Sequence, residues 1–444
     1  MDEIEMKETG LPWLPYIPER WDLKRNKDFL EEKKDVVGEK YLDYDLLSLT
    51  TRGIILRDMD SGKGKFPSDF SKYKIVSEGD IAFCLFDIDE TPRTVGLSPY
   101  DGMLTGAYSI FKLSGINPRY FYHYYLTLDN IKALKPLYSG LRKTIGSDAF
   151  GSIKLPVPPE DEQSKIVAYL DWQESTINKL IKTKRSELSL LNESKHIFIK
   201  NTVLGVENKN EKIKTDLPWA PFVPNNWKRY RLKQLLTPCH EKVGDISSEY
   251  LLLSLTTQGI IPRDIDSGKG KFPSDFSSYQ VVKKGEFVFC LFDIDETPRT
   301  VGLSEYDGMI TGAYSVFTTD NVDPKYLLYY FMTLDDEKAL KPLYTGLRKV
   351  ISTDVFLGQT IYLPPLEEQN EIVKKIEEFL KVSEKVGEAY QKEIILLKEI
   401  RTNIAIQIIS GVLDTRNLLI PEFEFIDDEE PSQSDNEFDD NEEV

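Results

Sequence analysis

The chain has 444 residues, of which 40% are hydrophobic and 11% aromatic, and its formal net charge is -18. This composition supports two to four domains with apolar cores and excludes a wholly disordered chain. No apolar run reaches the 18 residues of a membrane span, and the acidic start MDEIEMKETG is unlike a signal peptide. We therefore expect a cytoplasmic protein.

The charge excess is concentrated at the C-terminus. Residues 421–444 hold twelve acidic side chains and no basic ones, and without them the remaining 420 residues carry a net charge of only -6. Local basic patches can exist on such a body, so a nucleic-acid partner is not excluded. We expect the tail, residues 417–444, to be disordered and solvated, with competition for a basic groove as a weaker alternative.

An internal repeat with an offset of 206 residues organises the rest of the chain. The segment CLFDIDETPRTVGLS at 84–98 recurs letter for letter at 290–304, and residues 46–111 differ from residues 252–317 at only 14 of 66 positions. Two copies are too few for a solenoid. The repeat predicts two near-identical globular parts related by an internal pseudo-two-fold axis, like a homodimer joined in one chain.

The first section of each copy, residues 1–158 and 207–364, mixes strand and helix signals. Residues 75–86 are typical of a strand, a glycine turn and a second strand, and residues 60–71 of a loop. Residues 118–137 predict a helix with proline at its start and another near its end. The sequence therefore predicts an α+β domain in each copy, with Trp13 and Trp21 in the core of the first.

The second section of each copy, residues 159–206 and 365–416, predicts one long helix. Each begins after a Pro-Pro pair with acidic residues in its first turn. Apolar residues then recur at steps of three and four, among them Ile166, Leu170, Ile177 and Leu180. Each helix would be about 65 Å long. We expect the two to pair antiparallel and to separate the globular domains as a coiled-coil spacer, although such a stripe can equally be ordinary core packing.

Signals for catalysis are weak. DLPW at 216–219 lacks the second proline of an amino-methyltransferase motif, and SGKGKF is too short for a phosphate-binding Walker loop. The acidic cluster Asp87, Asp89 and Glu90 lacks a nuclease-type lysine, so we expect it to order its own loop by local hydrogen bonds. The three histidines have no metal-ligand spacing, and the three cysteines, Cys84, Cys239 and Cys290, predict reduced thiols.

Several segments together resemble the specificity (S) subunit of type I restriction-modification systems. They are the tryptophan-led starts at 11–21 and 217–227, the segments 140–170 and 346–376 with their PPxxEQ helix starts, and SGVLDTR at 410–416. The resemblance covers residues 11–416. One departure is that the two target recognition domains of this family usually differ, whereas here they are nearly the same.

The resemblance implies a non-enzymatic subunit that recognises DNA. Two target recognition domains would each bind half of a bipartite site, and two central helices would set the gap and dock two methyltransferase (M) subunits. Those partners would use S-adenosylmethionine to methylate adenine, and restriction (R) subunits would add ATP-driven cleavage. Since identical readers related by a two-fold axis read inverted half-sites, we expect a palindromic split target.

Candidate DNA contacts come from the repeated loops. Arginine and lysine reach base edges or phosphates, and a tyrosine could stack beside a flipped adenine. The candidates are Arg57, Lys63, Lys65, Arg93, Thr94, Tyr108, Arg142 and Lys143, with the mates Arg263, Lys269, Lys271, Arg299, Thr300, Tyr314, Arg348 and Lys349.

Each candidate also has a structural alternative. Arg93 could pair with Asp87 or Asp89 in its own loop, Tyr108 could belong to the core, and the lysines could simply be solvated. For the whole chain the alternatives are a stand-alone bipartite DNA-binding scaffold, an acidic DNA mimic, which the charge distribution disfavours, and an enzyme, which would need a cofactor loop.

Overall fold

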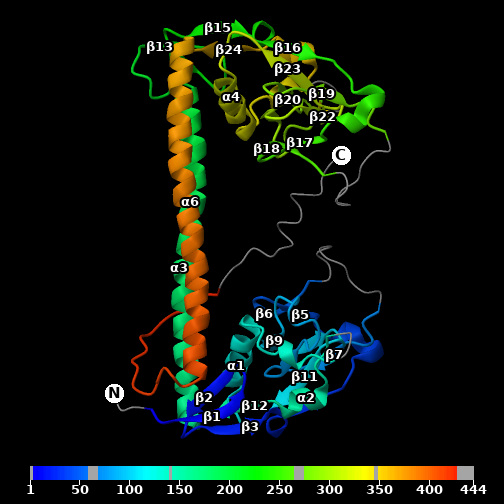
Figure 1. Ribbon diagram of the computed structural model, residues 1–444, viewed down its shortest axis with the longest axis vertical. Coiled ribbons are helices and arrows are strands. Elements are labelled where there is room, and N and C mark those ends of the chain that lie inside the picture. Colours follow the sequence, from blue (N-terminus) through cyan, green and yellow to red (C-terminus); the bar gives the residue numbers. More distant parts are fainter. Residues whose placement is uncertain (1–3, 59–68, 140–142, 265–274, 345–348, 428–444) are drawn as a thin grey trace. The chain divides into compact units, whose positions relative to one another are not determined.

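The computed structural model describes residues 4–58, 69–139, 143–264, 275–344 and 349–427 (Figure 1). The chain divides into two compact units, and unit 1 is formed by Met1–Ser186 and Tyr390–Asp435. Unit 2 is formed by Glu187–Ala389. Each unit therefore contains one α+β lobe and one segment from each of two long helices, α3 (Glu160–Val203) and α6 (Leu366–Ile409).

Unit 1 is built from short antiparallel ladders around one four-stranded sheet. The sheet has the order β4-β11-β8-β9, and the smaller ladders pair β1 with β2, β3 with β12, β5 with β6, and β7 with β10. The strands are β1 (Met6–Leu11), β2 (Leu14–Pro18), β3 (Asp22–Arg25), β4 (Leu30–Lys33), β5 (Leu47–Thr50), β6 (Gly53–Leu56), β7 (Lys74–Val76), β8 (Ile81–Phe83), β9 (Val95–Leu97), β10 (Gly102–Leu104), β11 (Ser109–Leu113) and β12 (Lys154–Val157).

Every ladder of unit 1 recurs in unit 2. The four-stranded sheet has the order β16-β23-β20-β21, and the pairs are β13 with β14, β15 with β24, β17 with β18, and β19 with β22. The strands are β13 (Lys212–Lys214), β14 (Phe222–Pro224), β15 (Lys228–Arg231), β16 (Leu236–Cys239), β17 (Leu253–Thr256), β18 (Gly259–Pro262), β19 (Gln280–Val282), β20 (Phe287–Phe289), β21 (Val301–Leu303), β22 (Gly308–Ile310), β23 (Ser315–Thr319) and β24 (Thr360–Leu363). The duplication in sequence is thus a duplication of the fold.

The strand, turn and second strand predicted at 75–86 are confirmed, but the two strands belong to different sheets. β7 pairs with β10, whereas β8 pairs with β9 and β11. Gly79 lies between them at φ +85° and its N–H bonds to the Ser98 carbonyl instead of closing a hairpin. Sequence pattern alone indicated the turn and could not indicate the partners of the strands.

Each lobe packs one helix against its sheet. In unit 1 this is α1 (Pro118–Asn130), whose N-cap Asn117 accepts hydrogen bonds from the N–H groups of Arg119 and Tyr120. The predicted range of 118–137 is too long, because Lys132 adopts a left-handed conformation (φ 49°) and Pro136 lies in a separate short turn. Its equivalent in unit 2 is α4 (Pro324–Asp336), capped by Asp323. Two shorter helices are α2 (Ser147–Ser152) and α5 (Thr353–Leu357).

Aromatic side chains dominate the core of unit 1. The rings of Phe83 and Phe150 lie 4.7 Å apart, and Tyr125 packs edge-on against Phe83 at 5.1 Å. Trp21 is fully buried in the same cluster. Trp13 packs on its edge and donates from Nε1 to the Tyr124 hydroxyl over 3.2 Å. The prediction of a core position is confirmed for Trp21, whereas Trp13 is half-buried at the edge of the core.

A glutamine near the start of each long helix ties that helix to the lobe. The Gln163 side chain accepts from the N–H of Asn117 over 2.9 Å and donates to the Pro158 carbonyl over 2.8 Å. Gln369 makes the same two bonds in unit 2, to Asp323 and Pro364. Both glutamines are buried. These hydrogen bonds explain the glutamine of the PPxxEQ segment, because its side chain fixes the first turn of α3 and of α6 to the N-cap of the lobe helix.

Within each unit the two long-helix segments run antiparallel. In unit 1, Arg401 of α6 donates to Asn178 of α3 over 2.7 Å, and further along α3 Lys184 pairs with Glu393 at 2.9 Å. In unit 2, Phe198 stacks on Phe379 with ring centroids 3.9 Å apart. Residues later in α3 thus pair with residues earlier in α6, as expected of antiparallel helices.

The predicted apolar stripe of α3 needs one correction. Ile166, Leu170 and Ile177 are buried as expected, but Leu180 is 48% exposed and Ile181 is fully buried in its place. A step of three from Ile177 places Leu180 outside the seam, whereas a step of four places Ile181 in it.

The described part of the tail contacts α3 at a few points. The carbonyl of Glu424 accepts from the Ser175 hydroxyl over 2.8 Å, and the Ile426 carbonyl accepts from the Asn178 amide over 2.9 Å. These contacts tie residues 424–426 to α3, while most of residues 417–427 remain exposed, and the disordered, solvated tail stays a prediction.

All three cysteines are free. Cys84 and Cys290 are buried at the ends of β8 and β20, and Cys239 is half-buried at the end of β16. Burial raises the pKa of all three thiols. None of the described helices is long and apolar enough to cross a membrane.

Candidate nucleic-acid interface

In the repeated loop that follows β8, the backbone carbonyl of Asp87 accepts the hydrogen bonds that hold the loop's shape. That residue adopts φ 44°, and its carbonyl accepts from the N–H and the hydroxyl of Thr91, both over 2.9 Å. Asp293 and Thr297 repeat the arrangement with φ 42°. Aspartate is among the residues that tolerate this left-handed conformation, which accounts for its place in both copies.

Asp89 joins this loop to a second one. Its carboxylate accepts from the Tyr138 hydroxyl over 2.8 Å and lies 3.1 Å from the Lys135 ammonium. These two groups hold the pKa of Asp89 at about 2. In unit 2, Tyr344 and Lys341 lower the pKa of Asp295 in the same way. Asp89 thus orders its loop through partners distant in sequence and not through the local hydrogen bonds that were predicted.

Lys143 and Lys349, expected to grip phosphate, lie on the second loop. Lys143 forms an ion pair with Glu90 at 2.7 Å and remains 45% exposed, and Lys349 pairs with Glu296 and is 42% exposed. Such exposed pairs contribute little to stability and exchange easily for another anion. The two ammonium groups are thus held in place at the surface without being buried.

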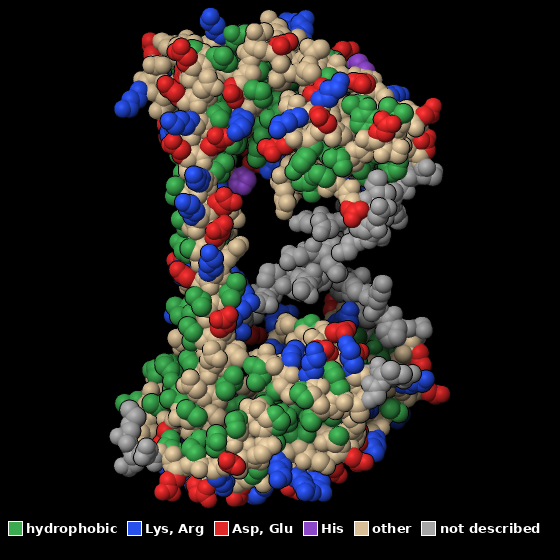
Figure 2. All heavy atoms as spheres, in the orientation of Figure 1, with side chains coloured by type: hydrophobic (Ala, Val, Ile, Leu, Met, Phe, Trp, Pro, Cys, Tyr) green, Lys and Arg blue, Asp and Glu red, His purple; other side chains and the backbone are tan. Residues whose placement is uncertain are grey.

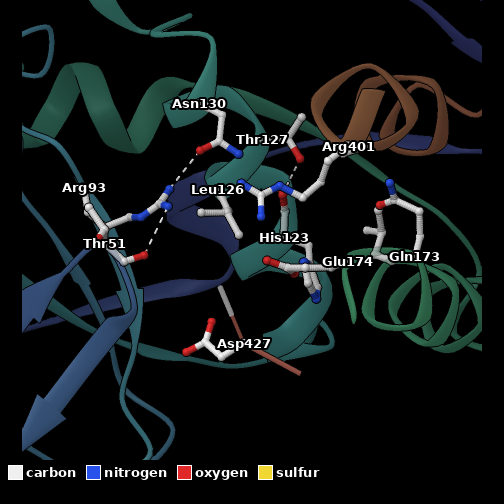
Figure 3. A pocket seen from close by; sticks show the side chains of 12 residues that line it. Thr51, Arg93, His123, Leu126, Thr127, Asn130, Gln173, Glu174, Arg401 and Asp427 are labelled. Atoms are coloured by element: carbon white, nitrogen blue, oxygen red, sulfur yellow. Dashed lines mark hydrogen bonds between the residues drawn. The ribbon is translucent and has the colours of Figure 1, made fainter. Parts of the chain in front are cut away.

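Arg93 is placed differently from either expectation. Its guanidinium contacts the Asp129 carboxylate of α1 at 3.3 Å and donates to Asn130 of α1 over 3.0 Å. It also donates to the Thr51 carbonyl over 3.3 Å, so its partners are not Asp87 or Asp89 (Figure 3 shows the contacts with Asn130 and Thr51). Arg299 pairs with Asp335 at 3.2 Å in the same manner. With side chains only 15% and 12% exposed, the two arginines hold the loop onto the lobe helix.

The structure contradicts the prediction that Thr94 and Thr300 contact DNA. They are 4% and 5% exposed, and their N–H groups donate to Asp129 and Asp335 over 2.9 and 3.0 Å. A side chain this deeply buried has no surface to offer to DNA. The two threonines anchor the end of the loop.

Tyr108 and Tyr314 pack at the rim of a small apolar cluster and not in the core, which was the structural alternative for Tyr108. Tyr108 lies over Phe86 with centroids 6.4 Å apart, and Tyr314 lies over Phe292 at 6.0 Å. Both rings are half-buried, and burial raises the pKa of Tyr108. A stacked aromatic pair of this kind stabilises the turn that follows β10 and β22.

Arg57 and Arg263 follow the β5–β6 and β17–β18 hairpins. Their N–H groups bond to the carbonyls of Leu46 and Leu252 over 2.9 and 2.8 Å, so the backbone is fixed at both positions. Arg57 is exposed and Arg263 half-buried. The remaining candidates, Lys63, Lys65, Arg142, Lys269, Lys271 and Arg348, lie outside the described residues.

Sequence reasoning missed the residues that organise these loops. They are Asp129, Lys132, Lys135 and Tyr138, with their mates Asp335, Lys338, Lys341 and Tyr344. A signal was present, because all four are identical in the two copies. On the face drawn in Figure 2, basic and acidic side chains are interspersed over each lobe. Among the described residues, no three His, Cys, Asp or Glu side chains are grouped so that they could hold a metal ion.

Comparison with known proteins identifies the class to which this fold belongs. A chain solved in work on complex assembly and conformational transition of the type I R-M system aligns with 89% of this chain and 99% of its own, with a TM-score of 0.57 and 15% identity. The HsdS subunit from Thermoanaerobacter tengcongensis aligns with 89% of this chain and 98% of its own, with a TM-score of 0.47 and 16% identity.

The family follows from the sequence match. Residues 18–190 and 302–394 match the type I restriction modification DNA specificity domain, and the chain belongs to this family. A curated relative is the type I restriction enzyme MjaVIII specificity subunit of Methanocaldococcus jannaschii, 26% identical over 438 residues, with 90% of this chain and 95% of the relative covered. The resemblance inferred from sequence motifs is therefore confirmed.

Proposed function

We propose that the chain is the sequence-specific DNA-recognition subunit of a type I restriction-modification complex and is not itself an enzyme. The observation that carries this proposal is the pair of equivalent lobes, whose loops are identical over 15 residues and held by the same contacts in both units. Family membership and the curated specificity subunit support it.

The target would be bipartite and palindromic. Two lobes with the same loop sequence offer the same side chains to DNA, so they would read the same half-site. α3 and α6, both of 44 residues, would form an antiparallel coiled-coil spacer with pseudo-two-fold symmetry that sets a degenerate gap. The antiparallel contacts within each unit support this arrangement.

The contacts to DNA would come from exposed or half-buried cations at the loops. Arg57 and Arg263 are proposed to read bases, since each directly follows an equivalent hairpin at a fixed backbone position. Lys143 and Lys349 would exchange their carboxylate partners for phosphates. The candidates Lys63, Lys65, Arg142 and their mates stay proposals for phosphate or base contact.

Partners would supply the chemistry. We propose that two methyltransferase subunits dock on the paired helices and bring S-adenosylmethionine, while restriction subunits add ATP and Mg²⁺. Copurification tests this part. A chain that binds a split DNA site but never retains an adenine methyltransferase would instead be a stand-alone scaffold.

The target itself is tested by sequencing methylated adenines in a host that expresses the complex. We expect one motif made of two inverted copies of the same half-site. Two unrelated half-sites would overturn the proposal that both lobes read alike.

Substitutions then connect the motif to residues. R57A should weaken recognition of one half-site by about tenfold or more, and R263A the other, since an arginine–guanine contact is worth about 1–3 kcal/mol. The matched control is R52Q, which installs the glutamine that the second copy has at position 258. Because that position differs between two lobes proposed to read alike, R52Q should leave the methylated motif unchanged. If the R57A/R263A double variant binds DNA as well as the native chain does, neither arginine contacts the DNA.

A further inference from the structure

The C-terminal segment runs along α3 of unit 1. Beyond α6, the carbonyl of Arg416 accepts from Lys165 over 2.8 Å, and Glu424 and Ile426 then meet Ser175 and Asn178. The tail from residue 416 to residue 426 therefore runs in the same direction as α3 from residue 165 to residue 178. We call residues 417–427 the strap.

Recognition of the strap uses its main chain. Ser175 donates from its hydroxyl to the Glu424 carbonyl over 2.8 Å and accepts from the Ile426 N–H over 3.0 Å. Asn178 donates from its side-chain amide to the Ile426 carbonyl over 2.9 Å. By contrast, the strap side chains Phe423 and Phe425 are 40% and 50% exposed. The helix therefore binds the strap through main-chain groups and leaves these two aromatic side chains largely exposed.

A neighbouring arginine orients the asparagine. Arg401 of α6 donates to Oδ1 of Asn178 over 2.7 Å, which leaves the amide nitrogen directed at the strap. Asn178 is 1% exposed and Ser175 is 3% exposed. Polar side chains this deeply buried are stable only when they are hydrogen-bonded, and the strap supplies their partners.

The second copy of the helix lacks this site. At the offset of 206 residues, Ser175 corresponds to Lys381, Asn178 to Glu384 and Arg401 to Lys195. Lys381 and Glu384 are exposed. A charged, solvated pair cannot reproduce the donor and acceptor pattern of serine and asparagine, so the site belongs to unit 1 alone.

The end of the strap also completes a polar cavity of unit 1. Asp427 lines a space of about 140 Å³ together with Arg93, His123, Gln173, Glu174 and Arg401 (Figure 3). At the equivalent positions of unit 2, His123, Gln173 and Glu174 are replaced by Tyr329, Phe379 and Leu380. Polar lining and the strap thus occur together in the same unit.

We propose that α3 carries, in unit 1 only, a binding site for an extended main chain, and that its ligand is the chain's own C-terminal strap. Ser175 and Asn178 bind the strap, Arg401 positions Asn178, and Asp427 lines the neighbouring cavity. The strap makes two lobes of nearly the same sequence inequivalent.

Hydrogen–deuterium exchange of the full-length chain tests the proposal, read out on peptides that cover residues 417–427. S175A removes one donor and one acceptor, and N178D keeps the acceptor for Arg401 but replaces the donor to Ile426 by a carboxylate. We expect each to speed exchange of the strap about tenfold, from the loss of one or two hydrogen bonds. I426P removes the donating N–H from the strap itself and leaves the helix intact, so it serves if a helix variant fails to fold.

The matched controls are K381A and E384A, at the equivalent positions of unit 2. Both should leave strap exchange unchanged. Limited chymotrypsin digestion gives an independent readout, because release of the strap should speed cleavage after Phe423 and Phe425 by a similar factor. Strap exchange as fast in the native chain as in the free peptide, or variants indistinguishable from the controls, would overturn the proposal.

Discussion

At the scale of single residues, Asp129 and Asp335 are the centres of the two lobes' loop networks. Each is 3% exposed, and each binds an arginine, a lysine and a threonine N–H. A buried carboxylate with this many partners fixes the loop after β8 to the lobe helix. The exposed cations of the interface depend on that placement.

Removing one of these carboxylates should be costly. D129A leaves the Arg93 guanidinium largely buried without its counter-charge, and we expect unfolding in urea to show a loss of about 3 kcal/mol. E90Q is the matched control, since it breaks the exposed Lys143 pair and should cost less than about 1 kcal/mol. Equal losses in the two variants would contradict the assigned roles.

The pH dependence of stability follows from Asp89. Its pKa in the folded chain, about 2, lies below its ordinary value of 3.8, so the carboxylate's contribution is fully present above about pH 4. That contribution is lost as the pH falls through about 2. Y138F removes the hydrogen bond that contributes most to the low pKa, and its destabilisation should shrink between pH 4 and pH 2. Urea unfolding at a series of pH values measures this, and a constant difference would contradict it.

Sequence predicted some of these residues and mistook others for clear reasons. The loop-ordering role of Asp89 followed from its short, repeated, acidic context. The partner of Arg93 did not, because Asp129 lies 36 residues further along the chain and meets it only through the packing of α1 on β9. Burial of Thr94 likewise depends on that packing and not on the polar neighbours it has in sequence.

At the scale of elements, the long helices are where periodicity was most informative. Both were expected from their proline starts, and both run for 44 residues. The choice between adjacent apolar residues was less certain, because a step of three and a step of four are both helical. Tertiary packing decided for Ile181 over Leu180.

Two substitutions test this register directly. I181A should destabilise the chain by about 3 kcal/mol, as is typical when a fully buried aliphatic side chain is cut to alanine. L180A, one position away with the same change in volume, should cost less than about 0.5 kcal/mol. Thermal or urea unfolding compares them, and the reverse order would show that the seam runs through Leu180.

At the scale of the whole molecule, charge and duplication act together. The body is close to neutral and the last 24 residues hold twelve carboxylates. If the lobes bind DNA as proposed, this tail opposes binding through long-range repulsion that salt screens. The repeat was readable without any structure, whereas the docking of the strap was not, since main-chain recognition leaves no side-chain pattern.

A chain that ends after residue 420 should bind its DNA site several-fold more tightly at about 50 mM salt, and the difference should vanish towards about 0.5 M. Fluorescence anisotropy over a salt series measures both limits. The control keeps residues 417–427 intact and replaces only the acidic residues beyond them by asparagine or glutamine. If that variant behaves like the full chain, the strap and not the net charge is responsible.

The three thiols offer a practical way to tell the twin lobes apart. Cys84 and Cys290 are buried, but Cys239 is partly accessible and has no counterpart in the first copy, where Lys33 occupies the position. A maleimide dye added to the native chain should therefore report from the second lobe alone. Spectroscopy on this protein can assign a signal to one half of a repeat without any engineered label site.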